Sequence, residues 1–245
     1  MSFDLAPLLT TEGLISLLTL VLLEIVLGID NIIFIAIICG KLPNKQQKNA
    51  RTIGLTLALA IRVLLLFTIT WIVQATKPMF YISEFGVSGR DLILFAGGVF
   101  LIVKTIIEIM HKFQAADDKT FKADKLTLTQ AIIQITLIDV VFSFDSILTA
   151  VGLSREIAVM VIAVIISMLV MLAFAPYVSD FINKYPTIKM LALVFLIIIG
   201  FLLVAEGLHI DTHAYKGYTY AGMAFSLIVE MLNIRLRIVS ERKNF

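Results

Sequence analysis

The sequence predicts an all-α membrane protein with seven transmembrane helices, as indicated by its composition, the lengths of its apolar runs and the placement of its charges. Of the 245 residues, 60% are hydrophobic and 16% are charged, whereas soluble domains carry about 45–50% apolar and about 25% charged residues. The length alone would allow one or two soluble domains, but a compact core cannot hide so much apolar surface from water. We therefore expect the chain to be embedded in a lipid bilayer.

Seven stretches are long and apolar enough to cross that bilayer, since a spanning helix needs about 20 mostly apolar residues. Their apolar runs show no period of two, which favours helices over an outer-membrane barrel. Short gaps with turn chemistry separate them. The predicted spans are Gly13 to Cys39, Thr52 to Thr76, Asp91 to Met110, Thr127 to Val151, Ile157 to Tyr177, Thr187 to Glu206 and Gly217 to Ile234.

Lysine and arginine are unequally divided between the two predicted sides of the membrane. One side carries fourteen of them and the other carries four. Because cytoplasmic loops hold the excess of positive charge, we expect an extracytoplasmic N-terminus and a cytoplasmic C-terminus. The segments on the predicted cytoplasmic side are Lys41 to Arg51, Lys112 to Lys125, Lys184 to Lys189 and Arg235 to Lys243.

Two similar motifs, one in the first span and one in the fourth, indicate an internal repeat. An odd number of spans per copy makes the two copies insert in opposite senses, which is the architecture of many secondary transporters. We expect a three-helix repeat at 1–110, a cytoplasmic linker at 111–126, a second, inverted three-helix repeat at 127–208, and a seventh span with a cytoplasmic tail at 209–245. At an offset of 115 residues, the matched polar positions are Glu24 with Asp139, Asp30 with Asp145, and Asn31 with Ser146.

The four matched carboxylates, which lie within the predicted spans, are the residues that best indicate a function. A charge in the middle of a span costs about 2.5–3.5 kcal/mol, and such residues usually face a bundle interior or a watery cavity and mark ion pathways. Glu24 and Asp30 point about 120° apart on a straight helix, so a shared site needs a helix break, which is cheapest at Gly28. Crossed at the midplane, the two helices would place Glu24 and Asp139 in the centre, with Asp30 and Asp145 toward opposite sides. The alternative is a set of buried ion pairs that only fixes helix packing.

We interpret these positions as a cation path. Their carboxylate, amide, hydroxyl and backbone oxygens suit Mg²⁺, Ca²⁺ and Mn²⁺ rather than Zn²⁺ or Cu⁺, and do not choose among the three. The single cysteine, Cys39, excludes a disulfide scaffold, an iron–sulfur site and a cysteine-rich zinc site. The expected metal ligands are Glu24, Asp30, Asn31, Asp139, Asp145 and Ser146.

Two basic residues inside the spans are candidates for a counter-ion or gate. Arg62 lies about 16 Å beyond Arg51, too deep to reach the surface easily. It either competes with a metal ion for the carboxylates or forms a permanent structural ion pair. Lys104 lies near the cytoplasmic end of its span with Glu108 one turn on, which favours snorkelling or a salt bridge along the helix.

The two motifs also carry a family resemblance. Leu23 to Asn31 and Asp139 to Ser146 resemble the two signature motifs of the TerC family (tellurium resistance protein C), and Pro186 to Leu193 and Ala224 to Asn233 resemble it as well. The similarity covers almost the whole chain, as a short form without extra cytoplasmic domains. It implies a seven-span protein of the bacterial inner membrane. Some members are described as manganese exporters, which implies Mn²⁺ as the ion and export as the direction.

Three functions compete on these observations. We expect an exporter of divalent metal coupled to proton exchange, because carboxylates that release a metal ion can take up protons. No phosphate-binding Gly-x-x-x-x-Gly-Lys-Ser/Thr loop is present, which argues against ATP as a partner. The dispersed net charge of +2 argues against nucleic acid. We expect neither enzymatic activity nor a resident cofactor.

The alternative is a factor for membrane-protein biogenesis or scaffolding with a structural metal or ion-pair site, a role linked to a plant relative that resembles the family. An intramembrane hydrolase with paired aspartates is the third, and it is disfavoured because the motifs lack a glycine-rich setting.

Overall fold

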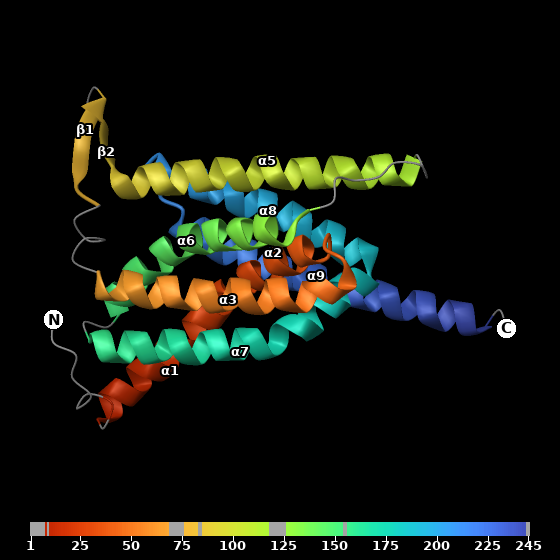
Figure 1. Cartoon of the computed structure of the whole chain (residues 1–245), viewed down its shortest axis with the longest axis horizontal. Coiled ribbons are helices and arrows are strands. Elements are labelled where there is room, and N and C mark those ends of the chain that lie inside the picture. Colours follow the sequence, from red (N-terminus) through yellow and green to blue (C-terminus); the bar gives the residue numbers. More distant parts are fainter. Residues whose placement is uncertain are drawn as a thin grey trace. The chain divides into compact units, whose positions relative to one another are not determined.

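The structure, a computed structural model, describes residue 8 and residues 10–68, 76–82, 85–117, 126–153 and 156–243. Nearly all of this part is helical (Figure 1). The elements are α1 (Thr11–Leu27), α2 (Ile29–Cys39), α3 (Asn44–Phe67), β1 (Pro78–Ile82), β2 (Phe85–Ser88), α5 (Gly89–Asp117), α6 (Leu128–Leu153), α7 (Ile157–Lys184), α8 (Pro186–Gly207) and α9 (His213–Lys243).

The fold is that of an all-α membrane protein, as the sequence predicts. Within the described residues, six helical segments are long and apolar enough to cross a membrane, with α1 and α2 counted together as one. The seventh predicted span lies inside α9, which is continuous but is not among the six. Tyr218, Glu230 and Asn233 interrupt its apolar stretch. The six segments are Thr11–Cys39, Asn44–Phe67, Gly89–Gln114, Leu128–Leu148, Ile157–Lys184 and Pro186–Gly207.

Several helices extend beyond the predicted apolar windows. α3 begins at Asn44 rather than near Thr52, and α5 continues through the start of the predicted linker to Asp117. The added turns are rich in Lys, Gln and Ala, which favour helix even where they do not favour lipid. Residues 118–125, the rest of the predicted linker up to Lys125, lie outside the described part of the chain.

A short antiparallel hairpin precedes α5 and was not predicted. β1 and β2 pair from Pro78 with Ser88 to Ile82 with Phe85, with an irregularity near Pro78. The hairpin leads directly into α5, where Ser88 and Asp91 cap the helix start reciprocally. The backbone N–H of Ser88 donates to Asp91 Oδ2 at 2.8 Å, and the backbone N–H of Asp91 donates to Ser88 Oγ at 3.2 Å.

The chain divides into two compact units, and each combines parts of both predicted repeat copies. Unit 1 comprises residues 1–93 and 124–183, and unit 2 comprises residues 94–123 and 184–245. Unit 1 thus holds the first two spans of each predicted copy, α1–α2 with α3 and α6 with α7. Unit 2 holds most of α5, the third span of the first copy, together with α8 and α9. The division of the sequence into two repeats stays a prediction.

Helix α6 is the central helix of unit 1, in contact with α1, α2 and α3. Its most extensive contact is with α3, where a Cβ added at Gly54 would lie 2.9 Å from Ile135 Cγ2. α3 and α6 run in the same direction, and α1–α2 runs opposite to both (Figure 1). The two helices that carry the motifs therefore have opposite senses, which an inverted repeat requires.

In unit 2, α5 and α8 approach through glycine. A Cβ added at Gly98 would lie 2.7 Å from the carbonyl oxygen of Gly200, so the absence of a side chain allows the two backbones to touch. α9 packs against α8. α9 also carries large apolar side chains that are exposed, among them Phe225, Ile228 and Leu236.

Candidate functional site

The centre of unit 1 contains a buried guanidinium held by two carboxylates. Arg62 Nη1 on α3 lies 2.6 Å from Glu24 Oε2 on α1, and its Nη2 lies 2.9 Å from Asp139 Oδ1 on α6. The Nε of Arg62 also donates to both oxygens of Asp139, at 3.2 and 3.3 Å. The side chains of Arg62 and Glu24 are 2% exposed and that of Asp139 is 5% exposed. The matched acids of the two motifs therefore meet on one cation.

The packing of α3 against α6 positions this guanidinium. The contact between Gly54 and Ile135 holds the two parallel helices close, two turns before Arg62 and one turn before Asp139. A larger residue at position 54 would push α3 away from α6. Because Gly54 has no side chain, α3 lies close enough to α6 for Arg62 to form hydrogen bonds with Asp139.

The first span is interrupted at a glycine, four residues after Glu24. α1 ends at Leu27 and α2 begins at Ile29, so the interruption falls at Gly28, as predicted. It is slight, since the backbone of Gly28 stays in the right-handed helical region and its N–H still donates to the carbonyl oxygen of Glu24 at 2.8 Å. A Cβ at Gly28 would collide with Met171 Sδ on α7 and lie 2.8 Å from the carbonyl oxygen of Glu24. The glycine is therefore required by close packing. In the second motif, where Ser143 takes this place, α6 continues without interruption.

Asp139 receives two further hydrogen bonds. Asn31 Nδ2 donates to its Oδ1 at 3.3 Å, and Ser143 Oγ donates to its Oδ2 at 3.1 Å. Asn31 lies seven residues after Glu24, about two helical turns, so both side chains lie on the same side of the first span. Ser146 instead donates to the backbone carbonyl of Ser143 at 3.3 Å.

The cluster contains more acceptors than donors. Glu24 and Asp139 carry two formal negative charges against the single positive charge of Arg62. Glu24 Oε1 and Asn31 Oδ1 are buried and have no hydrogen-bond partner within the described residues. Buried polar atoms are normally paired, and an unpaired acceptor in a low-dielectric interior favours a nearby cation. The cluster can thus hold more positive charge than Arg62 supplies.

The other predicted residues lie at several places in the chain. Asp30 is buried on α2, at 2% exposure. The side chain of Asp145 lies outside the described part of the structure. Lys104 belongs to unit 2, with its Nζ 6.0 Å from the centre of the Phe100 ring. Glu108, its predicted helix partner, pairs with Lys189 at 3.8 Å.

No three His, Cys, Asp or Glu side chains gather as metal ligands in the part of the chain that the structure describes. Between the two matched acids stands Arg62. Of the six predicted ligands, the contacts of this cluster bring together Glu24, Asn31 and Asp139. The full ligand set stays a prediction.

Sequence reasoning did not assign a role to Ser143. It lies four residues after Asp139, and positions i and i+4 share one face of a helix. From this spacing alone, the Ser143 hydroxyl could have been predicted to donate a hydrogen bond to the Asp139 carboxylate.

Comparison with known proteins places the chain in a family. The protein-family model described as "Integral membrane protein TerC family" matches residues 9–244 of this chain. A "UPF0053 protein" of Haemophilus influenzae is 46% identical over 227 residues, which is 92% of this chain and 95% of that protein. The UPF0053 inner membrane protein YgdQ of Escherichia coli K12 is 46% identical over 216 residues, 88% of this chain and 90% of its own.

A longer relative matches the same region. The UPF0053 inner membrane protein YoaE of Escherichia coli K12 is 46% identical over 218 residues, covering 89% of this chain and 42% of YoaE. The chain thus spans less than half of that protein. No solved structure matches the chain. With a match along nearly its whole length and relatives named as inner membrane proteins, the chain belongs to the TerC family of integral membrane proteins.

Proposed function

We propose that this protein carries a divalent cation across the inner membrane, with Glu24 and Asp139 as its central ligands. In this proposal Arg62 and the cation compete for the same two carboxylates. The single observation that carries the proposal is the cluster itself: two buried acids from opposite repeat motifs share one guanidinium, with unpaired acceptor oxygens beside it.

Charge balance supports a divalent cation over a monovalent one. Arg62 neutralises one of the two formal charges of Glu24 and Asp139, whereas a divalent ion neutralises both. Charges taken out of water are stabilised only by close opposite charge and hydrogen bonds. A divalent ion in place of the guanidinium would therefore be favoured by the electrostatics of this centre.

The donor set supports a hard cation. When Arg62 moves away, the carboxylates of Glu24 and Asp139 remain, and the side chains of Asn31 and Ser143 lie beside Asp139. Carboxylate, amide and hydroxyl oxygens are ligands of Mg²⁺, Ca²⁺ and Mn²⁺. Mn²⁺ as the preferred ion and export as the direction rest on the resemblance to described manganese exporters in the family.

Proton coupling follows from the same carboxylates. A carboxylate that loses a metal ion in a buried site is favoured to take up a proton, because burial disfavours the charged form. Antiport of a metal ion against protons then needs no catalytic chemistry and no nucleotide. We place the N-terminus on the extracytoplasmic side of the membrane, from the excess of Lys and Arg in the alternate loops.

The test is metal-dependent stabilisation of the purified full chain. A ligand that binds only the folded protein stabilises it by about 2.7 kcal/mol at 100 times its dissociation constant. Mn²⁺, Ca²⁺ and Mg²⁺ are titrated during thermal unfolding of the wild type, of Glu24→Gln, and of Glu12→Gln, whose acid lies exposed in the first turn of α1. Stabilisation of wild type and Glu12→Gln that is lost in Glu24→Gln is expected.

A wild type that none of the three ions stabilises would contradict the proposal. The arrangement of Arg62 would then favour the second function, a biogenesis or scaffolding factor. One observation supports that alternative directly: the guanidinium already bonds both acids, as a permanent structural ion pair would.

A further inference from the structure

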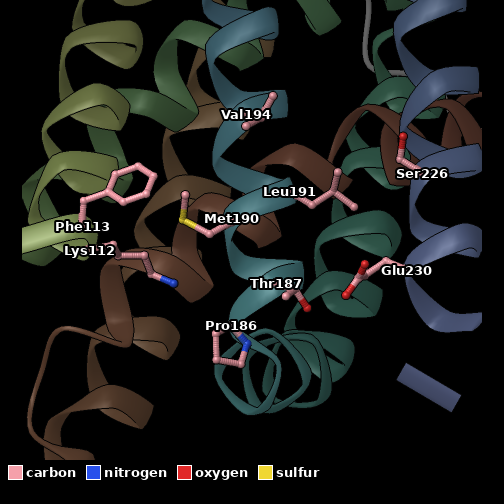
Figure 2. A pocket seen from close by; sticks show the side chains of 9 residues that line it. All are labelled: Lys112, Phe113, Pro186, Thr187, Met190, Leu191, Val194, Ser226 and Glu230. Atoms are coloured by element: carbon pink, nitrogen blue, oxygen red, sulfur yellow. The ribbon is translucent and has the colours of Figure 1, made fainter. Parts of the chain in front are cut away.

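Unit 2 contains a cavity of about 730 Å³ that is open to the surface. Three helices line it: α5 with Lys112 and Phe113, the first turns of α8, and α9 with Glu230 (Figure 2). Its volume lies within the range of about 300–1,000 Å³ that is usual for ligand pockets. None of its lining residues belongs to unit 1, so the proposed transport site does not account for it.

The two charged groups of this cavity lie at one end, whereas the other end is apolar except for Ser226. The Nζ of Lys112 and the carboxylate of Glu230 both point toward the start of α8, where Thr187 lies (Figure 2). Farther along α8 the lining side chains are apolar, through Met190 to Val194. A ligand that fits this order has a charged group at one end and a hydrocarbon portion at the other.

The charged end of the cavity offers both signs of charge. Glu230 Oε2 accepts a hydrogen bond from Asn233 Nδ2 at 3.4 Å, while its Oε1 is buried without a hydrogen-bond partner within the described residues. Lys112 supplies an ammonium. The first turn of α8, which begins at Pro186 without a side-chain cap, adds the positive end of a helix dipole.

We propose that this cavity binds a phospholipid whose headgroup is zwitterionic and ends in a primary amine, as in phosphatidylethanolamine. The headgroup phosphate contacts Lys112 and the start of α8, since helix N-termini and ammonium groups both favour phosphate. The headgroup ammonium donates to Glu230 Oε1. An acyl chain covers Phe113 and Met190 and continues through the open side into the bilayer.

This arrangement discriminates between headgroups. A phosphatidylcholine headgroup has no N–H to donate to Glu230. A phosphatidylglycerol headgroup has no cation, so it cannot form an ion pair with that carboxylate. Among the three lipids, phosphatidylethanolamine alone can form a hydrogen-bonded ion pair with Glu230. Such a pair at a partly exposed site contributes up to about 1 kcal/mol, so we expect a preference for phosphatidylethanolamine of about fivefold over either lipid.

The test is native mass spectrometry of the purified full chain in detergent, titrated with phosphatidylethanolamine, phosphatidylcholine or phosphatidylglycerol of identical acyl chains. The wild type should retain phosphatidylethanolamine preferentially. Glu230→Gln should reduce its binding to the level of the other two lipids, and Lys112→Met should weaken all three. Glu12→Gln and Lys45→Met, two exposed residues of unit 1, are the matched controls and should bind as wild type does.

A charge reversal keeps the proposal testable if a neutral variant is poorly folded. Glu230→Lys places a second cation at the headgroup end and should shift the preference to phosphatidylglycerol. Equal retention of the three lipids by the wild type, or a phosphatidylethanolamine preference that survives both Glu230 variants, would overturn the proposal. Metal stabilisation is independent of these outcomes.

Discussion

Replacing Arg62 tests the buried cluster most sharply. Arg62→Met keeps an apolar stem on α3 but leaves Glu24 and Asp139 without their shared cation. Removing one partner of a buried ion pair costs about 3–5 kcal/mol, because an uncompensated charge remains in the interior. For a chain of this size, about 2–4 °C of melting temperature accompanies each kcal/mol, so we expect a loss of about 6–20 °C.

Leu66→Ala is the matched control for this prediction. Leu66 lies one turn beyond Arg62 on α3 and is fully buried. Its truncation costs about 2–5 kcal/mol through a cavity, with no change in charge. Both variants should therefore melt well below wild type.

Divalent metal separates the two variants. If Arg62 competes with the cation, Mn²⁺ raises the melting temperature more in Arg62→Met than in Leu66→Ala at the same concentration. The assay is thermal unfolding in detergent with and without Mn²⁺. An equal shift in both variants would refute competition for the carboxylates, and an Arg62→Met variant as stable as wild type would refute the ion-pair account altogether.

Two further predictions follow from the packing and the hydrogen bonds around the cluster. Gly28→Ala should lower stability by about 1–3 kcal/mol because the added methyl group overpacks against Met171, whereas Gly222→Ala, where nothing lies within 4 Å, should leave the melting temperature unchanged or raise it. Ser143→Ala removes the hydroxyl that bonds Asp139 at 3.1 Å and should raise the half-saturating Mn²⁺ concentration about tenfold, as loss of a supporting group commonly does. Ser167→Ala, whose hydroxyl donates to the backbone carbonyl of Val164 at 3.0 Å, is its control, and equal half-saturation in the two serine variants would contradict the assigned support.

The sequence predicted the helical membrane fold and the central pair of acids because both leave strong local signals. Apolar runs of spanning length are hard to produce by chance in a soluble chain. The match of Glu24 with Asp139 placed two costly charges at equivalent depths, and the structure joins both to Arg62.

Other features depend on contacts that a single sequence does not display. The hairpin of β1 and β2 is set by cross-strand pairing over a few residues next to α5. The close approach at Gly54 depends on which side chain, Ile135, faces it from a distant helix. Helix α3 also begins earlier than the predicted span, because polar residues such as Lys45 favour helix formation without being apolar.

The hydrogen bond from Ser143 to Asp139 could have been predicted from the sequence. Its spacing from Asp139 predicts a shared helix face, yet the repeat alignment drew attention to the helix break in the other copy. The break at Gly28 is found in the first motif, where glycine permits close packing on Met171. The second motif reaches the same centre on an unbroken helix.

The central claim, that Glu24 and Asp139 carry a divalent cation through the membrane, is tested most directly by flux. Mn²⁺, Ca²⁺ and Mg²⁺ uptake is measured in proteoliposomes under an imposed proton gradient, for wild type, Asp139→Asn and the exposed control Glu12→Gln. The account predicts Mn²⁺ flux in wild type and Glu12→Gln that is abolished in Asp139→Asn. Undiminished flux in Asp139→Asn, or no flux of any of the three ions through folded wild-type protein, would contradict it.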